Sequence, residues 1–160
     1  MIDQQAIQKR YDSDGFVFPM DVLDADATRQ LRDELERAEH ELIDDPERLA
    51  LLRAYPDRLL PSFDHLIRHP LLVEAATCVL GPDLMVWSAA LFIKEPMTDK
   101  IVSWHQDLTY WGLDDAEETT CWVALSDANE ASGAMKFVAG SHKQSIVDHV
   151  DTFAEDNLLS

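Results

Sequence analysis

The sequence predicts an α+β fold, with helices in the first half and short strands in the second. The helices are predicted by the patterns at residues 24–42 and 70–80, and the strands by four apolar runs after residue 82. A chain of 160 residues with 46% hydrophobic residues is long enough for one domain with one core. We therefore expect a single domain over residues 1–160, in which residues 1–82 are mainly helical and residues 83–160 contain the strands.

The clearest helical pattern begins at Asp24. Apolar residues follow it at steps of three or four, which places them on one stripe of a helix. They are Ala27, Leu31, Leu35, Ala38 and Leu42. Asp24 or Asp26 would cap the first turn by accepting backbone N–H bonds. A second helix is predicted from Pro70 or Leu71 to Leu80, because a proline suits the first helical position and the glycine at position 81 suits a C-terminal stop.

The predicted strands are short apolar segments bounded by polar or glycine-containing stretches. Residues 84–94 read LMVWSAALFIK, a partly β-branched and aromatic run that the turn EPMTDK ends. Then follow IVSWHQD at 101–107, TTCWVAL at 119–125 and AMKFV at 134–138. Strands at this spacing after a run of helices favour a sandwich or barrel over a parallel α/β sheet.

The charge of the chain excludes two classes of function. Its net charge is −18, and acidic residues crowd residues 21–47 and the loop at 114–118. Such a surface repels phosphate backbones and anionic lipids, so we expect no nucleic-acid and no membrane partner. The first residues, MIDQQAIQKRYD, lack the apolar run of a secretory signal, and the longest apolar-rich run, LLVEAATCVLG, is too short to span a membrane. We therefore expect a cytoplasmic protein.

The triplet His105-Gln106-Asp107 is the strongest chemical signal in the sequence. On a strand, residues two apart point to the same face, so His105 and Asp107 would present an imidazole and a carboxylate to one metal ion. A second histidine would complete the 2-His-1-carboxylate facial triad of non-haem Fe(II) oxygenases. The triplet alone is a weak signal, because His-x-Asp arises often by chance and a histidine beside a tryptophan is more often a packing or surface residue.

Longer segments around this triplet resemble the phytanoyl-CoA dioxygenase family of Fe(II)- and 2-oxoglutarate-dependent oxygenases. The similar segments, in order and with family-like separations, are YDSDGFVFPMDVL, LFIKEP, WHQDLTYWGLD, TTCWVALSDANEASGAM and FVAGSHK. The resemblance covers the whole chain. It implies that the predicted strands form an incomplete double-stranded β-helix, a cupin-like jelly roll, with its C-terminal strands missing.

The resemblance also implies roles for individual residues. His105 and Asp107 align with the first two iron ligands of the family and would be the catalytic residues. Gln106, Trp122 and Ala90 correspond to positions at the 2-oxoglutarate site. The implied cofactor is Fe(II), the cosubstrate is 2-oxoglutarate, and the partners are O2 and a small-molecule substrate. Because halogenating relatives carry a small residue where Asp107 stands, the resemblance favours hydroxylation.

The family's third ligand, a histidine, and the arginine that binds 2-oxoglutarate have no counterpart in the sequence, whose last arginine is Arg68. His142 and His149 lie in segments that resemble family segments without the distal ligand, so we expect neither to replace it. The chain is thus expected to be the N-terminal part of a longer dioxygenase. The alternative is a catalytically incompetent fragment or remnant whose open strand edges promote self-association. Whether the substrate is an acyl-CoA or a free metabolite, and which oligomer forms, stay open.

Overall fold

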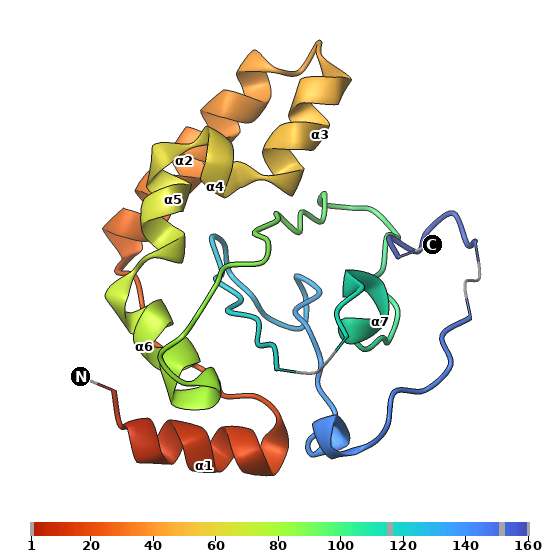
Figure 1. Cartoon of the computed structure of the whole chain (residues 1–160). Helices are drawn as coiled ribbons and strands as arrows, with labels where there is room; N and C mark the ends of the chain where they lie inside the picture. Colours follow the sequence, from red (N-terminus) through yellow and green to blue (C-terminus); the bar gives the residue numbers. More distant parts are fainter. Residues whose placement is uncertain (1, 115–116, 151–152, 160) are drawn as a thin grey trace.

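The computed structural model of the chain describes residues 2–114, 117–150 and 153–159 (Figure 1). Asp115 and Ala116 of the acidic loop lie outside the described residues. Within these ranges, six of the eight helical elements fall in the first half of the chain. The elements are α1 (Gln4–Asp14), α2 (Ala25–Glu41), α3 (Pro46–Ala54), α4 (Pro56–Leu59), α5 (Pro61–Ile67), α6 (Pro70–Leu80), α7 (Leu108–Trp111) and the 3₁₀ helix η1 (Ser141–Lys143).

Helix α2 confirms the helical prediction at residues 24–42. The side chain of Asp24 caps it by accepting a hydrogen bond of 2.8 Å from the backbone N–H of Ala27. This bond satisfies one of the donors that the first turn of a helix leaves unpaired. The apolar stripe faces inward, and Leu31 and Leu35 are buried.

Prolines start the four helices that follow α2. Pro46, Pro56, Pro61 and Pro70 each occupy the first turn of a helix, from α3 to α6. Proline suits this position because its fixed φ is already helical and its missing N–H would have no partner there. Helix α6 confirms the predicted helix over 70–80, and Gly81 is its C-cap as expected.

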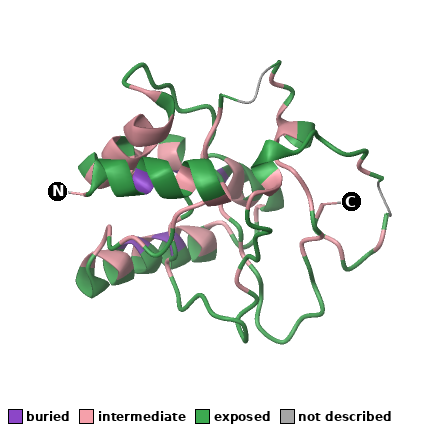
Figure 2. Cartoon of the chain, turned by 90° about the horizontal axis from the view of Figure 1, so that it is seen from below, coloured by how far each residue is buried: buried purple, intermediate pink, exposed green. Residues whose placement is uncertain are grey.

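The core of the described chain lies among the helices. Its buried residues are Leu31, Leu35, Leu52 and Phe63, and Leu52 is only 2% exposed. Figure 2 shows buried residues on helical ribbons, whereas the long irregular segments are intermediate or exposed. From the second half of the chain, Leu91 and Leu125 pack against this core.

The predicted jelly roll is wrong for the described part of the chain. Residues 84–94, 119–125 and 134–138 form neither helix nor strand there, and the one β-bridge joins Ile101 to Asn157. An apolar, β-branched composition produces a strand only where a neighbouring segment supplies backbone partners. Within 84–94 the N–H of Leu91 instead donates to the carbonyl of Arg53 at the end of α3, at 2.8 Å.

The irregular second half is also tied to the C-terminal end of α1. The backbone N–H of Gly140 donates to the carbonyl of Asp14 at 2.8 Å. The Tyr11 and Thr119 hydroxyls form a hydrogen bond of 3.0 Å. The first contact places the turn AGSHK, residues 139–143, beside α1, as the ribbon in Figure 1 also shows, and the second places Thr119 there.

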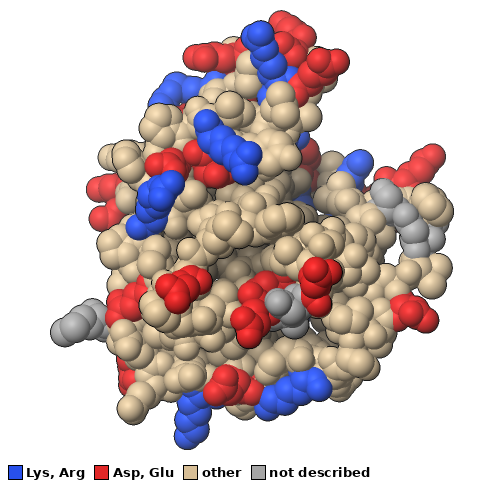
Figure 3. Space-filling model, in the orientation of Figure 1, with Lys and Arg blue, Asp and Glu red and all other residues tan. Residues whose placement is uncertain are grey.

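The surface of the molecule is strongly acidic, in line with its net charge of −18. On the face in Figure 3, the Lys and Arg side chains lie mostly over the helices in the upper part of the view, whereas Asp and Glu occur across the whole face. Within the described ranges, no helix combines the length and the apolar character that a membrane crossing requires.

Candidate metal centre

His105 and Asp107 lie in a turn that leads into α7, and the predicted strand at 101–107 is absent. Asp107 has helical backbone angles, φ −56° and ψ −42°, and is the N-cap of α7. The carbonyls of Gln106 and Asp107 accept hydrogen bonds from the N–H groups of Thr109 (3.1 Å) and Tyr110 (2.9 Å). Local turn bonds, not a strand ladder, therefore hold this segment.

The turn nevertheless brings the two predicted ligands together. His105 Nε2 lies 3.0 Å from Asp107 Oδ1, and the two side chains are 24% and 44% exposed. Ligand bonds from nitrogen and carboxylate oxygen to a first-row divalent metal are about 2.1 Å long, so two ligands at a right angle lie about 3.0 Å apart. The observed separation equals the one that two neighbouring octahedral ligands need.

The tautomer of His105 is fixed by its other ring nitrogen. Nδ1 lies 2.8 Å from the carbonyl oxygen of Ser103, which can only accept, so Nδ1 carries a proton and donates it. Nε2 is left facing the Asp107 carboxylate. Two lone pairs facing each other at 3.0 Å need a cation, which is either a proton on Nε2 or a metal ion bound by both atoms. Ligating histidines commonly donate their second N–H to a carbonyl in this way.

The carboxylate of Asp107 has a second, weaker contact. The Thr120 hydroxyl donates to Asp107 Oδ2 at 3.5 Å, the long limit of a hydrogen bond, so Oδ1 stays with His105. Cys121 follows Thr120 in the sequence and is exposed, but partial desolvation raises the pKa of its thiol. A thiol with a raised pKa stays protonated near neutral pH and competes poorly for metal.

The three residues predicted at the 2-oxoglutarate site are placed differently from one another. Gln106 lies between the ligands, and its Oε1 accepts a hydrogen bond of 2.9 Å from the N–H of Val147. Ala90 and Trp122 are exposed, and among the described residues no hydrogen bond or ion pair connects either side chain to His105 or Asp107. Their assignment to a cosubstrate site stays a prediction.

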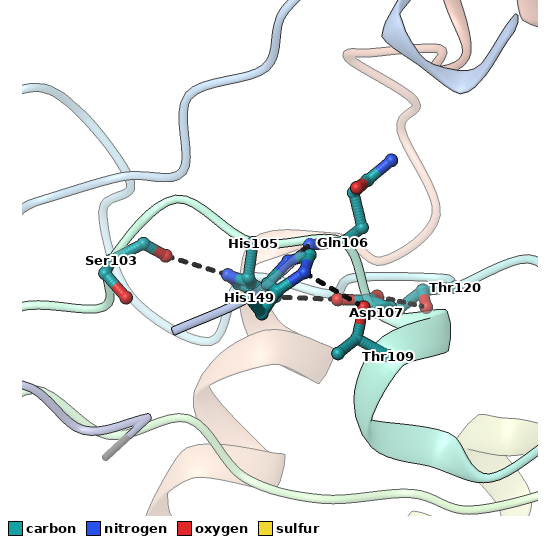
Figure 4. A network of polar contacts seen from close by, with 7 residues as sticks. All are labelled: Ser103, His105, Gln106, Asp107, Thr109, Thr120 and His149. Carbon is teal, nitrogen blue, oxygen red and sulfur yellow. Dashed lines mark hydrogen bonds and ion pairs between the residues drawn. The ribbon is translucent and has the colours of Figure 1, made fainter. Parts of the chain in front are cut away.

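His149 belongs to the polar network of this centre, shown in Figure 4. Its Nε2 accepts a hydrogen bond of 2.9 Å from the backbone N–H of Gln106, and its Nδ1 lies 2.8 Å from the carbonyl of Val147. The sequence offered no signal for this contact, because the partners are 43 residues apart.

Neither candidate for an additional histidine ligand is placed as one. Both ring nitrogens of His149 are engaged, and His142 lies at α1, where its Nε2 is 3.3 Å from the carbonyl of Asp12. Across residues 2–114, 117–150 and 153–159, no group of three or more His, Cys, Asp or Glu side chains is placed to hold a metal ion. In the described chain, the two predicted ligands His105 and Asp107 lie side by side, and no third predicted ligand joins them.

Comparison with known proteins gives one family. The model of the phytanoyl-CoA dioxygenase (PhyH) family matches residues 11–159, nearly the whole chain. No solved structure matches the chain significantly.

Three curated relatives illustrate the range of the matches. The ectoine dioxygenase of Bordetella parapertussis is 30% identical over 149 residues, which cover 85% of this chain and 48% of the relative. The peroxisomal phytanoyl-CoA dioxygenase of Mus musculus is 26% identical over 164 residues, covering 89% of this chain and 48% of the relative. A probable alpha-ketoglutarate-dependent hypophosphite dioxygenase of Stutzerimonas stutzeri is 28% identical over 94 residues, covering 59% and 32%. The chain spans about half the length of the first two relatives.

Proposed function

Because the chain belongs to the phytanoyl-CoA dioxygenase family, we propose that the whole protein is an Fe(II)- and 2-oxoglutarate-dependent dioxygenase that hydroxylates a small organic substrate. The observation that carries the proposal is the 3.0 Å separation of His105 Nε2 and Asp107 Oδ1. A nitrogen and a carboxylate oxygen at this distance are placed as two of the three donors of a facial triad would be.

The residues present fit Fe(II) by their chemistry as well as by their spacing. His105 would bind through Nε2, since Nδ1–H is held by the Ser103 carbonyl, and Asp107 would bind through Oδ1. The ion, when bound, supplies the redox centre at which O2 is activated while 2-oxoglutarate is decarboxylated to succinate. The protein's own part is to hold His105 Nε2 and Asp107 Oδ1 3.0 Å apart before the ion arrives, so that binding would require little rearrangement.

The relatives are about twice as long as this chain. We assign two further residues to the half of the relatives' sequences that the match does not cover. They are the third ligand, a histidine, and the arginine that holds the distal carboxylate of 2-oxoglutarate. Guanidinium suits the second task because its planar fork binds a carboxylate through two hydrogen bonds. Gln106, Trp122 and Ala90 are the residues of this chain that we assign to the cosubstrate side of the centre.

Two observations favour a compact free metabolite over an acyl-CoA as substrate. Several relatives are named ectoine dioxygenases, including the one that is 30% identical to this chain. In addition, a net charge of −18 opposes a substrate that carries several phosphates.

The metal assignment is tested by titrating the 160-residue chain with Mn(II), a redox-stable substitute for Fe(II), and following free Mn(II) by electron paramagnetic resonance. We expect weak binding, because only two protein ligands are present, and a loss of at least about tenfold in affinity for His105→Ala and Asp107→Ala. The control is Asp44→Ala, which removes one exposed carboxylate from the turn between α2 and α3. Equal losses for Asp107→Ala and Asp44→Ala would mean that surface charge holds the ion. In the longer protein, Asp107→Ala should abolish succinate formation.

A further inference from the structure

We infer that His149 is a positioning residue for the metal centre: it fixes the backbone between the two ligands and is not itself a ligand. The inference rests on the proposed role of His105 and Asp107. It addresses how a segment without a strand ladder holds two ligands at a fixed separation.

Two hydrogen bonds join Gln106 to one short segment of distant chain. The N–H of Gln106 donates to His149 Nε2 at 2.9 Å, and the Oε1 of Gln106 accepts from the N–H of Val147, also at 2.9 Å. Val147 and His149 thus form hydrogen bonds with both the side chain and the backbone of Gln106, the residue between the proposed ligands. The bond to His149 fixes the peptide plane that joins His105 to Gln106.

The hydrogen bonds of His149 show why it is not a ligand. Nε2 accepts from a backbone N–H, so it carries no proton and its lone pair is occupied. Nδ1 therefore carries the proton and donates to the carbonyl of Val147 at 2.8 Å, with the Thr109 hydroxyl at 3.2 Å. No lone pair of the ring is left for a metal ion.

Tyr110 couples the two histidines through packing. Its ring lies edge-on to His105, with centroids 6.0 Å apart, and edge-on to His149, with centroids 5.8 Å apart. Edge-to-face pairs of this separation prefer one relative orientation. The plane of the His105 ring is therefore set by Tyr110 as well as by the Ser103 carbonyl, and Tyr110 is itself packed against His149.

Replacing His149 should weaken metal binding, because the hydrogen bond to the Gln106 backbone is lost. Partners in the outer shell of a metal site typically contribute 10- to 100-fold to metal affinity. His149 acts through the backbone, so we expect His149→Leu to weaken Mn(II) binding by about tenfold. His149→Gln places an amide oxygen where Nε2 accepts, and it should restore most of the affinity. A simple packing role would not distinguish glutamine from leucine in this way.

A second measurement follows the bond itself. Hydrogen exchange of the Gln106 amide, measured by NMR on the metal-free chain, should be faster by about tenfold in His149→Leu and close to the original rate in His149→Gln. His40→Ala, which removes an exposed histidine near the end of α2, is the control for metal binding by histidines elsewhere on the surface. It should change neither readout.

The outcomes separate the inference from the proposed function. If His105→Ala and Asp107→Ala leave Mn(II) binding unchanged, the metal assignment fails and the positioning role fails with it. If those variants lose binding while His149→Leu retains both affinity and Gln106 protection, the positioning role alone is overturned.

If His149→Leu unfolds, as judged by circular dichroism, the positioning role is tested with His149→Gln and Gln106→Ala instead. Gln106→Ala keeps the backbone bond and should lose less than about threefold in affinity; a loss of about tenfold would show that the side-chain bond to Val147, not His149, positions the ligands.

Discussion

The C-terminal end of α1 depends on a residue without a side chain. Gly15 caps this helix with φ +85°, and its N–H donates to the carbonyl of Tyr11 at 2.8 Å. The imidazole of His142 lies directly against it, so that a Cβ at position 15 would be 2.8 Å from His142 Cγ. Gly15 therefore serves both the left-handed cap and the docking of the turn at residues 139–143.

Gly15→Ala should destabilise the chain by more than the backbone strain alone. A left-handed conformation costs a residue with a Cβ about 1–2 kcal/mol, and displacing His142 adds to this cost. Gly112→Ala is the matched control, because Gly112 has φ +65° but nothing within 4 Å of the methyl carbon that alanine would add, so it should show only the strain. Urea unfolding of both variants measures the difference. In a His142→Ala background most of the extra cost of Gly15→Ala should be lost, because only the Cβ of residue 142, at 3.1 Å, remains close; an equal cost in both backgrounds would contradict the contact.

At the scale of elements, α3 shows how one short helix connects the core to the irregular half. Leu52 is buried in the core cluster, and Arg53 forms an ion pair with Glu39 of α2, with Nε and Oε1 2.6 Å apart. The carbonyl of Arg53 accepts the N–H of Leu91. Helix α3 thus contacts α2 on one side and the segment at 84–94 on the other.

Leu52→Ala should cost about 2–5 kcal/mol of unfolding free energy, because it leaves a cavity in a site that is 2% exposed. Its neighbour Leu51 lies on the same helix but is 52% exposed, so Leu51→Ala should change stability by no more than about 0.5 kcal/mol. Leucine and alanine have similar helix propensities, so the pair isolates burial. Comparable losses in urea unfolding for both variants would mean that α3 does not face the core as described.

The comparison of sequence with structure differs between helices and strands for a physical reason. Helix α2 was predictable because its stripe and its Asp24 cap are local features. A strand depends on a partner strand that can be far away in the sequence. Among the described residues, the segment at 84–94 has no such partner and instead forms a backbone hydrogen bond, through Leu91, with the end of α3. Apolar composition alone does not reveal which partner is available.

The candidate site follows the same division between local and distant contacts. His105 and Asp107 are two residues apart, so their proximity was predictable even though the strand geometry invoked for it is wrong. Thr120 contacts Asp107 across 13 residues, and His149 contacts Gln106 across 43 residues. The local sequence around Thr120 and His149 does not predict either contact.

At the scale of the whole molecule, the chain exposes more surface than a compact protein of its size. Its accessible surface is 12194 Å², whereas a folded monomer of this mass exposes about 8,100 Å². Many large apolar side chains of the second half are exposed. Examples more than half exposed are Met85, Trp87, Phe92, Trp104, Phe137 and Val150. A surface of this kind is typical of a segment that packs against further protein.

Native-state hydrogen exchange should therefore divide the chain into two levels of protection. Backbone amides near Leu35 and Leu52 belong to helices packed in the buried core, so they should exchange only on near-global unfolding. Amides of the irregular residues 119–125 and of most of 84–94 should exchange by local opening. A gap of about 4 kcal/mol between the two levels corresponds to roughly a thousandfold difference in exchange rate. The Leu91 amide is an internal control, because its bond to the Arg53 carbonyl should make it slower than its neighbours. Equal protection of both halves, read by NMR amide by amide, would contradict this division.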